Sequence, residues 1–155
     1  AAAAAAASAF LPSFPSTPRT KIAISDGSSI RTTFVDESET ESIERTRSIN
    51  VSVVSLFAID GLLKGEIYVR NLAYEKKVVI RYTVDGWSTY SEIEAAFSRN
   101  VEEDIDAFDF SLTFPIEDVS GCELCVSYSV NDSVFWDNNE DTNYRLEYDE
   151  NEKKK

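Results

Sequence analysis

Apolar and polar residues alternate in short rows along the chain from Ser48 onward. The clearest row holds Phe108, Phe110, Leu112 and Phe114, with an aspartate, a serine and a threonine between them. Five further rows share this period of two and begin at Ile49, Gly65, Val78, Leu124 and Tyr144. A period of two is typical of a strand with one buried face, and no segment keeps a helical period over three turns. The pattern therefore predicts short strands and no helix, as in an antiparallel β-sandwich of about 100 residues.

Turn-forming dipeptides lie between the predicted strands, at Asp85-Gly86, Ser120-Gly121 and Asn131-Asp132. Residues 1 to 47, by contrast, are rich in Ser, Thr, Pro and charge and show little usable period. An acidic run, DESETESIE, covers residues 36 to 44. Such a composition is typical of a flexible segment. We therefore predict a linker or docking segment over 1–47, a β-sandwich over 48–150 and a charged tail over 151–155.

The charge balance narrows the class of partner. The chain has 15 basic and 28 acidic residues, which gives a net charge of -13. Nucleic acids and anionic membranes need clustered Lys and Arg, so neither is an expected partner. No apolar run approaches the roughly 18 residues of a membrane span, and the start of the chain shows no signal-peptide pattern. A neutral partner, or one with a basic face, fits this composition better.

Two cysteines, Cys122 and Cys125, have the Cys-x-x-Cys spacing of some zinc and redox sites. A zinc site needs about four ligands, and this chain has no histidine and no other cysteine. A redox motif would open a helix, whereas this one runs into the strand pattern of Val126, Tyr128 and Val130. We therefore predict two ordinary reduced thiols, which favour an intracellular protein.

Signatures of enzymes are missing from the sequence. Without histidine there is no Ser-His or Cys-His pair, and no glycine-rich phosphate loop occurs. Asp137, Asn139 and Asp141 match the first side-chain ligands of a calcium loop, but Thr142 and Tyr148 stand where glycine and glutamate belong. We therefore expect a non-catalytic protein without a metal or cofactor.

The stretch FWDNNEDTNY, residues 135–144, sets a tryptophan beside amides and acids that suit burial poorly. It is either a plain exposed turn or a surface that binds a ligand with many hydroxyls. Trp87 follows the Asp-Gly turn in DGWSTY and is expected on a loop. Sugars stack their C–H faces on aromatic rings and pair their hydroxyls with amides, so Trp87 and Trp136 could form a carbohydrate platform. The alternative is that the tryptophans belong to the core, as is common in sandwiches.

Two ordered motifs resemble carbohydrate-binding module family 21. The first is GEIYVRNLAYEKKVVIRYTVDGW, from Gly65 to Trp87, and the second is FWDNNEDTNY. The similarity to the family extends roughly from Ser48 to Tyr148. The resemblance implies an all-β, antiparallel, immunoglobulin-like β-sandwich of about eight strands. It also implies that this sandwich binds α-1,4-glucan, meaning starch or glycogen.

The same resemblance implies two glucan sites. The main site combines the turn tryptophan with the second motif, and carried over by position its residues are Trp87, Trp136, Asp137, Asn138, Asn139, Asn143 and Tyr144. A second site, found in the starch-binding relatives, uses the N-x-x-Y-x-K residues Asn71, Tyr74 and Lys76. Tyr74 could equally be a half-buried residue at a strand end. In targeting subunits the W-D-N-N stretch is also linked to docking of phosphatase substrates, so this surface could meet a protein instead of sugar.

Members of the family occur as modules of secreted amylolytic enzymes and as glycogen-targeting regulatory subunits of protein phosphatase 1. The stretch EKKVVIRYTVDGWSTY is more similar to the targeting subunits. The resemblance then implies a cytoplasmic, glycogen-particle-associated protein. Its partners would be protein phosphatase 1 and glycogen synthase or phosphorylase. The alternatives are a starch-binding module appended to a secreted amylolytic enzyme, and a protein-docking sandwich that no longer binds sugar.

Two segments approach the phosphatase-docking motif of such subunits, which is a basic residue, Val or Ile, any residue, then an aromatic. Lys21-Ile22-Ala23-Ile24 has isoleucine in place of the aromatic. Arg31-Thr32-Thr33-Phe34 has threonine in place of the first aliphatic residue. The candidate docking residues are therefore Lys21, Ile22, Ile24, Arg31 and Phe34.

Overall fold

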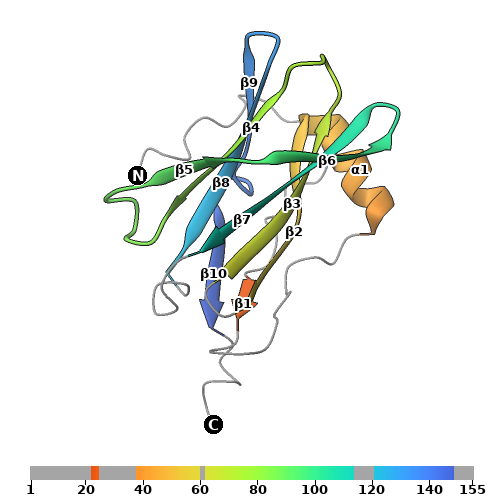
Figure 1. The fold of residues 1–155 in the computed structure, drawn as a ribbon. Helices are drawn as coiled ribbons and strands as arrows, with labels where there is room; N and C mark the ends of the chain where they lie inside the picture. The colour runs from red at the N-terminus through yellow and green to blue at the C-terminus, as the bar shows by residue number, and fades with distance from the viewer. Residues whose placement is uncertain (1–21, 25–37, 60–61, 114–120, 149–155) are drawn as a thin grey trace.

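Two β-sheets make up most of the described chain (Figure 1). The computed structural model describes residues 22–24, 38–59, 62–113 and 121–148, and within these ranges the chain forms ten strands and one helix. Six strands form the first sheet: β1 (Ile22–Ile24), β10 (Tyr144–Tyr148), β8 (Glu123–Val130), β9 (Ser133–Asp137), β4 (Lys77–Thr83) and β5 (Ser91–Glu94). Its order is β1-β10-β8-β4-β5, with β9 also paired to β8. The second sheet has the order β2 (Val51–Ile59), β3 (Leu62–Arg70), β7 (Ile105–Thr113) and β6 (Ala96–Glu102).

Paired strands run antiparallel, except that β1 lies parallel to β10. β8 is central in the first sheet, because it pairs with β4 on one side and with β9 and β10 on the other. The chain changes sheets between β5 and β6 at Ala95, whose backbone N–H donates to the Val78 carbonyl (2.8 Å). The antiparallel β-sandwich that the sequence predicts is therefore confirmed.

The hydrophobic core lies between the two sheets. The predicted rows supply it: Phe108, Phe110 and Leu112 of β7 are buried, while the residues between them are exposed. The other rows do the same through the buried residues Val51, Val53, Ile67, Val69, Val78, Ile80, Leu124, Val126, Tyr128, Val130, Tyr144 and Leu146. Ile49 is the exception, because it ends the helix and precedes the strand that its row predicts.

The helix α1 (Glu39–Ile49) was not predicted, and it begins inside the range expected to be flexible. Its start is a capping box, in which the Ser38 side chain accepts from the Glu41 N–H (3.1 Å) and the Glu41 carboxylate accepts from the Ser38 N–H (2.8 Å). Ile43 packs in a second apolar cluster with Tyr68, Ile105 and Ala107 of the second sheet. The helix has few apolar residues, so its stability comes from this packing and its caps, which a periodicity search misses. Within the described ranges, no helix is long and apolar enough to cross a membrane.

Both cysteines are free and buried, as predicted for ordinary thiols. Burial is the main cause that raises the pKa of each thiol to about 12. Cys122 belongs to the core between the sheets. Such thiols are almost entirely protonated at neutral pH and are chemically inert.

Candidate functional site

The turn between β4 and β5 carries Trp87 in a left-handed backbone conformation. Gly86 and Trp87 have φ values of 70° and 74°. For a residue with a side chain this conformation costs about 1–2 kcal/mol, so it needs local support. The support comes from Asp85, whose carboxylate accepts from the Thr83 hydroxyl (2.8 Å), the Thr89 N–H (3.0 Å) and the Thr89 hydroxyl (2.7 Å). These bonds, those from Thr89 above all, lower the pKa of Asp85 below its ordinary value of 3.8.

The ring of Trp87 is held in place from β8. Its indole N–H donates to Glu123 Oε1 (2.9 Å), and the Asn143 side-chain amide donates to the same oxygen (3.2 Å). Arg145 pairs with the other carboxylate oxygen (3.4 Å). Among the described residues, no donor reaches the buried Oδ1 atom of Asn143. Glu123 thus joins Trp87 to the loop after β9.

Two aromatic rings extend this surface. Tyr90 is 52% exposed, and its ring centroid lies 6.4 Å from that of Trp87. Trp136, on β9, is half-buried and is opposite Ser127 of β8. Trp87, Trp136 and Asn143 therefore have accessible surface, which the platform hypothesis requires. The sequence analysis gave no role to Tyr90, although it is the last residue of DGWSTY, and Glu123 lies outside the quoted motifs. Their distances to Trp87 reveal both.

The expectation that FWDNNEDTNY is an exposed stretch is wrong for its centre. Asp137, Asn138 and Asn139 are 5%, 4% and 6% exposed, and Tyr144 is 2% exposed. Asp137 accepts from the Val53 N–H (2.8 Å), the Asn139 N–H (3.1 Å) and the Tyr144 hydroxyl (2.8 Å to Oδ2). These partners remove the cost of burying the carboxylate, which is why polar residues can occupy this position.

The loop that follows β9 closes on itself through its amides. Asn138 donates from its side chain to the Asp141 carboxylate (3.2 Å) and accepts from the Asp141 N–H (3.1 Å). The Asn139 side chain donates to the Asn143 carbonyl (3.1 Å). Asn139, Glu140, Asp141 and Asn143 all have positive φ, a conformation that asparagine and aspartate tolerate better than most residues. The asparagines of this motif therefore build a compact loop, and Asn143 links this loop to Trp87 through Glu123.

A second group of candidate residues lies at the opposite end of β4, in the loop that joins β3 to β4. Tyr74 is 95% exposed, so it is not the half-buried residue of the alternative reading. The Lys76 side chain, by contrast, is mostly buried. Its Nζ atom pairs with Asp106 Oδ2 (3.2 Å), and both side chains are 8% exposed. Asn71 is exposed, and its backbone N–H donates to the Asp104 carbonyl (2.8 Å).

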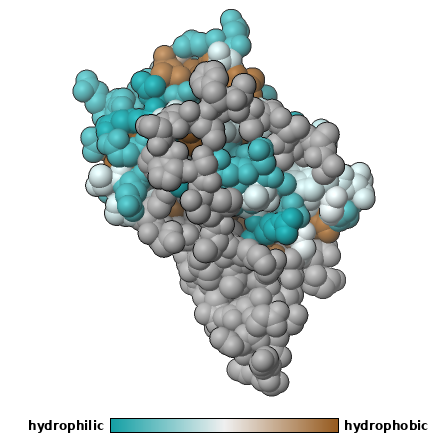
Figure 2. Space-filling model, turned by 180° about the vertical axis from the view of Figure 1, so that it is seen from behind, coloured by the Kyte–Doolittle hydropathy of each residue, from teal (hydrophilic) through white to brown (hydrophobic). Residues whose placement is uncertain are grey.

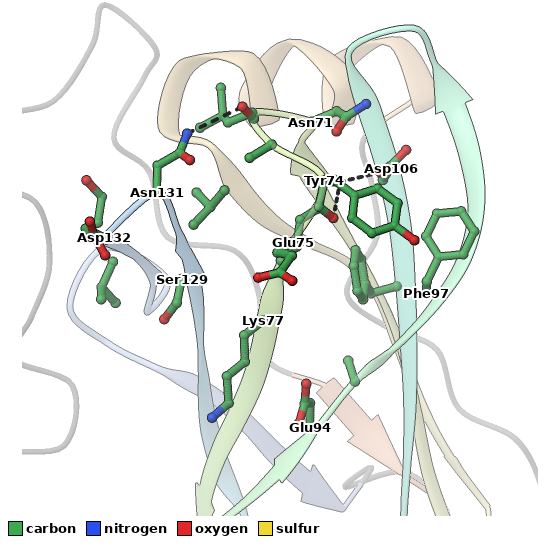
Figure 3. A pocket seen from close by; sticks show the side chains of 18 residues that line it. Asn71, Tyr74, Glu75, Lys77, Glu94, Phe97, Asp106, Ser129, Asn131 and Asp132 are labelled. Carbon is green, nitrogen blue, oxygen red and sulfur yellow. Dashed lines mark hydrogen bonds and ion pairs between the residues drawn. The ribbon is translucent and has the colours of Figure 1, made fainter.

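These residues line a broad pocket of about 1560 Å³ (Figure 3). Phe97 of β6 also lines it, is 59% exposed and packs edge-on against Phe108 at 5.9 Å between ring centroids. Phe97 was missed because a single exposed phenylalanine on an irregular edge strand carries no sequence signal.

Figure 2 shows the face behind that of Figure 1, where most of the described surface is hydrophilic and hydrophobic residues gather at the upper end.

The candidate docking residues are only partly described. Ile22 and Ile24 belong to β1, which pairs with β10 in the register Ile22 to Leu146 and Ile24 to Tyr148. Lys21, Arg31 and Phe34 lie outside the described residues.

Comparison with known proteins agrees with this fold. The sequence profile of carbohydrate/starch-binding module family 21 matches residues 44–147, and the chain belongs to this family. Protein phosphatase 1 regulatory subunit 3C of Rattus norvegicus is 41% identical over 91 residues, which are 56% of this chain and 29% of that protein. Regulatory subunit 3B of Homo sapiens is 31% identical over 106 residues, 66% of this chain and 37% of that protein. The chain thus spans about a third of the length of these curated relatives.

Two solved structures have the same fold. The carbohydrate-binding module of the muscle glycogen-targeting subunit of protein phosphatase 1 superposes with a TM-score of 0.60 at 25% identity, covering 80% of this chain and 90% of that one. The starch-binding domain of Rhizopus oryzae glucoamylase, solved with β-cyclodextrin and maltoheptaose, superposes with a TM-score of 0.52 at 30% identity. The match covers 63% of this chain and 92% of that domain.

Proposed function

We propose that this chain is a non-catalytic module that binds α-1,4-glucan, and that it belongs to a regulatory subunit targeting protein phosphatase 1 to glycogen. The observation that carries the sugar-binding part is the turn of Trp87. A partly exposed indole is held in a strained backbone conformation, and its N–H is already bonded to Glu123. A ring fixed in this way offers its face to a ligand without further loss of conformational entropy.

The chemistry of this surface fits a neutral sugar. Trp87, Tyr90 and Trp136 supply aromatic area for the C–H faces of glucose rings. Asn143 is half-buried beside this surface, and its amide shares the Glu123 carboxylate with the Trp87 indole. Asp137, Asn138, Asn139 and Tyr144 take part indirectly, because they hold the loop that presents Asn143.

The pocket at the other end of β4 supplies a second glucan-binding region. Tyr74 and Phe97 are its exposed rings, and Asn71 lies in the same loop as Tyr74. Lys76 holds that loop to β7 through Asp106, so it supports the region more than it contacts the ligand. Each region alone would bind in the micromolar to millimolar range, about -8 to -4 kcal/mol. A branched glucan presents many copies of the ligand, so two regions gain by avidity.

The targeting role follows from the relatives. Those with the higher sequence identity are regulatory subunits of protein phosphatase 1, and a module from such a subunit has the higher TM-score of the two structures. We therefore propose protein phosphatase 1 as a partner, glycogen synthase or phosphorylase as further partners, and a cytoplasmic location at glycogen particles. The net charge of -13 leaves nucleic acid and anionic membrane as unexpected partners.

The test of the glucan proposal is a titration with β-cyclodextrin and maltoheptaose, followed by calorimetry and tryptophan fluorescence. We expect Trp87→Ala to weaken β-cyclodextrin binding by at least about tenfold, since a stacked aromatic ring contributes over 1 kcal/mol. Tyr74→Ala should remove a separate, weaker binding event, and the double variant should bind neither sugar. Thermal unfolding of each variant controls for misfolding. If the folded wild-type chain binds neither sugar at millimolar concentration, the result contradicts the proposal and favours a protein-docking sandwich.

The phosphatase proposal needs its own test. Purified phosphatase 1 catalytic subunit is titrated against the whole chain and against two variants, Ile22→Ala with Ile24→Ala, and Phe34→Ala. Loss of binding in one variant identifies which segment docks. Unchanged binding in both variants would refute these residues as the docking site, without affecting the glucan result.

A further inference from the structure

Arg81 lies between two aromatic rings of the proposed glucan surface. Its guanidinium carbon is 4.6 Å from the ring centroid of Tyr90 and 5.1 Å from that of Trp136. Both distances are within the range of a cation–π interaction. The two rings come from different parts of the sheet, since Tyr90 directly precedes β5 and Trp136 is on β9. Arg81 of β4 therefore connects one end of the aromatic surface to the other.

Besides the two rings, a carboxylate also contacts the guanidinium of Arg81. Arg81 Nε and one terminal nitrogen each lie 2.8 Å from Glu92 Oε2. Glu92 is directly opposite Arg81 on the neighbouring strand β5, so the backbone fixes this pair. The pair neutralises the charge of Arg81, and a flat, neutralised guanidinium between two rings suits packing better than the capture of an anion.

The side of Arg81 that faces the sheet is filled as well. Cys125 is its cross-strand partner on β8 and is completely buried. Cross-strand partners point to the same face of a sheet, so the thiol lies beneath the guanidinium. With the thiol below, Glu92 on one side and rings on two others, Arg81 has little freedom to leave.

We propose that Arg81 is a positioning residue of the glucan surface, which fixes the ring of Trp136 in the orientation that stacks on sugar. This inference rests on the proposed glucan binding. Trp136 is on β9, a five-residue strand that ends in the loop of Asp137 to Asn143. The ring needs a lateral contact to keep one orientation, and Arg81 supplies it. Without Arg81, Trp136 samples several rotamers and pays an ordering cost on binding.

The experiment uses the whole chain and leaves one tryptophan as the reporter in near-ultraviolet circular dichroism. The chain has two tryptophans, so Trp87→Phe leaves Trp136 as the sole reporter. Near-ultraviolet circular dichroism of Trp87→Phe is compared with that of Trp87→Phe carrying Arg81→Met. We expect the tryptophan bands to lose intensity when Arg81 is removed. Arg99→Met is the matched control, because Arg99 pairs with Glu66 (3.0 Å) on the other sheet and should leave the bands unchanged.

Affinity for maltoheptaose supplies the second measurement. We expect Arg81→Met to weaken binding roughly two- to tenfold, because the freed Trp136 side chain then pays the cost of being ordered on binding. In a Trp136→Phe background the same change should have no further effect, because Arg81 acts through that tryptophan. If Arg81→Met does not fold, Glu92→Gln removes the ion pair but keeps the guanidinium. Smaller losses of tryptophan band intensity and of maltoheptaose affinity are then expected.

The outcomes separate cleanly. Unchanged tryptophan bands with unchanged affinity overturn the proposal. Equal losses of affinity with and without Trp136 also overturn it, because Arg81 would then act on the sugar by itself. If the wild-type chain binds no glucan, the proposed function fails, and the ligand-free tryptophan bands still decide whether Arg81 positions Trp136.

Discussion

Replacing Asp137 by asparagine tests whether the W-D-N-N motif is a framework or a contact surface. Asp137 receives bonds from three donors, the N–H groups of Val53 and Asn139 and the hydroxyl of Tyr144. Val53 belongs to the second sheet, so this one carboxylate also ties β9 to β2. Asparagine has nearly the same shape but only one acceptor oxygen.

The expected cost follows from these contacts. The asparagine amide must point toward one of the backbone N–H groups, which leaves that buried donor without an acceptor at about 1–3 kcal/mol. The remaining bonds lose their charge assistance, which costs about 1 kcal/mol more. We therefore expect Asp137→Asn to lower the free energy of unfolding by about 2–4 kcal/mol. Tyr144→Phe removes a single hydroxyl donor and should cost about 1–2 kcal/mol.

Urea unfolding, followed by circular dichroism and tryptophan fluorescence, measures both variants. The slope of free energy against urea should stay constant, since the surface exposed on unfolding does not change. Titration of the folded variants with β-cyclodextrin then separates the two roles, and we expect affinities within about twofold of wild type, under 0.5 kcal/mol. The reasoning is refuted if Asp137→Asn loses less than about 1 kcal/mol of stability. It is also refuted if the variant is stable but no longer binds sugar, because Asp137 would then contact the ligand.

Two further predictions concern pH and packing. The pKa of Asp85 is lowered in the fold, so its stabilising bonds are fully present above pH 3.8 and are lost as the pH falls through the lowered pKa. The stability difference between wild type and Asp85→Asn should therefore shrink below pH 3.8, and a constant difference in thermal melts from pH 2 to 7 would contradict the assignment. Gly65→Ala should cost about 1–3 kcal/mol, because the new methyl would lie 2.7 Å from Phe110 Cζ and 2.8 Å from Leu56 Cδ2. Gly86→Ala is its control in urea unfolding, since no atom lies within 4 Å and only the positive φ opposes it.

The strands that alternate cleanly could be predicted because each has one face in the core. β7 is the best case, with Phe108, Phe110 and Leu112 inward and its polar residues outward. β6 escaped prediction for the opposite reason, because it is an edge strand with most of its residues exposed and two register shifts against β7. Its strand conformation comes from pairing with β7, which a local pattern does not contain.

The helix α1 shows the same limit in another form. The capping box of Ser38 and Glu41 is visible in the sequence, but the helix has only a narrow apolar face. Ile43 is buried because Tyr68, Ile105 and Ala107 of distant strands meet it. A helix stabilised by partners this far away in sequence is not expected from its own period. Whether residues 1–47 as a whole form a linker stays a prediction.

The motif FWDNNEDTNY shows why a binding site and its framework look alike in sequence. In the strand, neighbouring side chains point to opposite faces, so Trp136 lies at the proposed glucan surface while Asp137 points into the protein. The loop then uses Asn138 and Asn139 to close itself and presents Asn143 beside Trp87 through Glu123. The motif therefore mixes residues that lie at the proposed glucan surface with residues that hold the loop in place. Substitutions should therefore divide into two kinds: changes at Trp136 that weaken affinity at constant stability, and changes at Asp137 or Asn139 that weaken stability first.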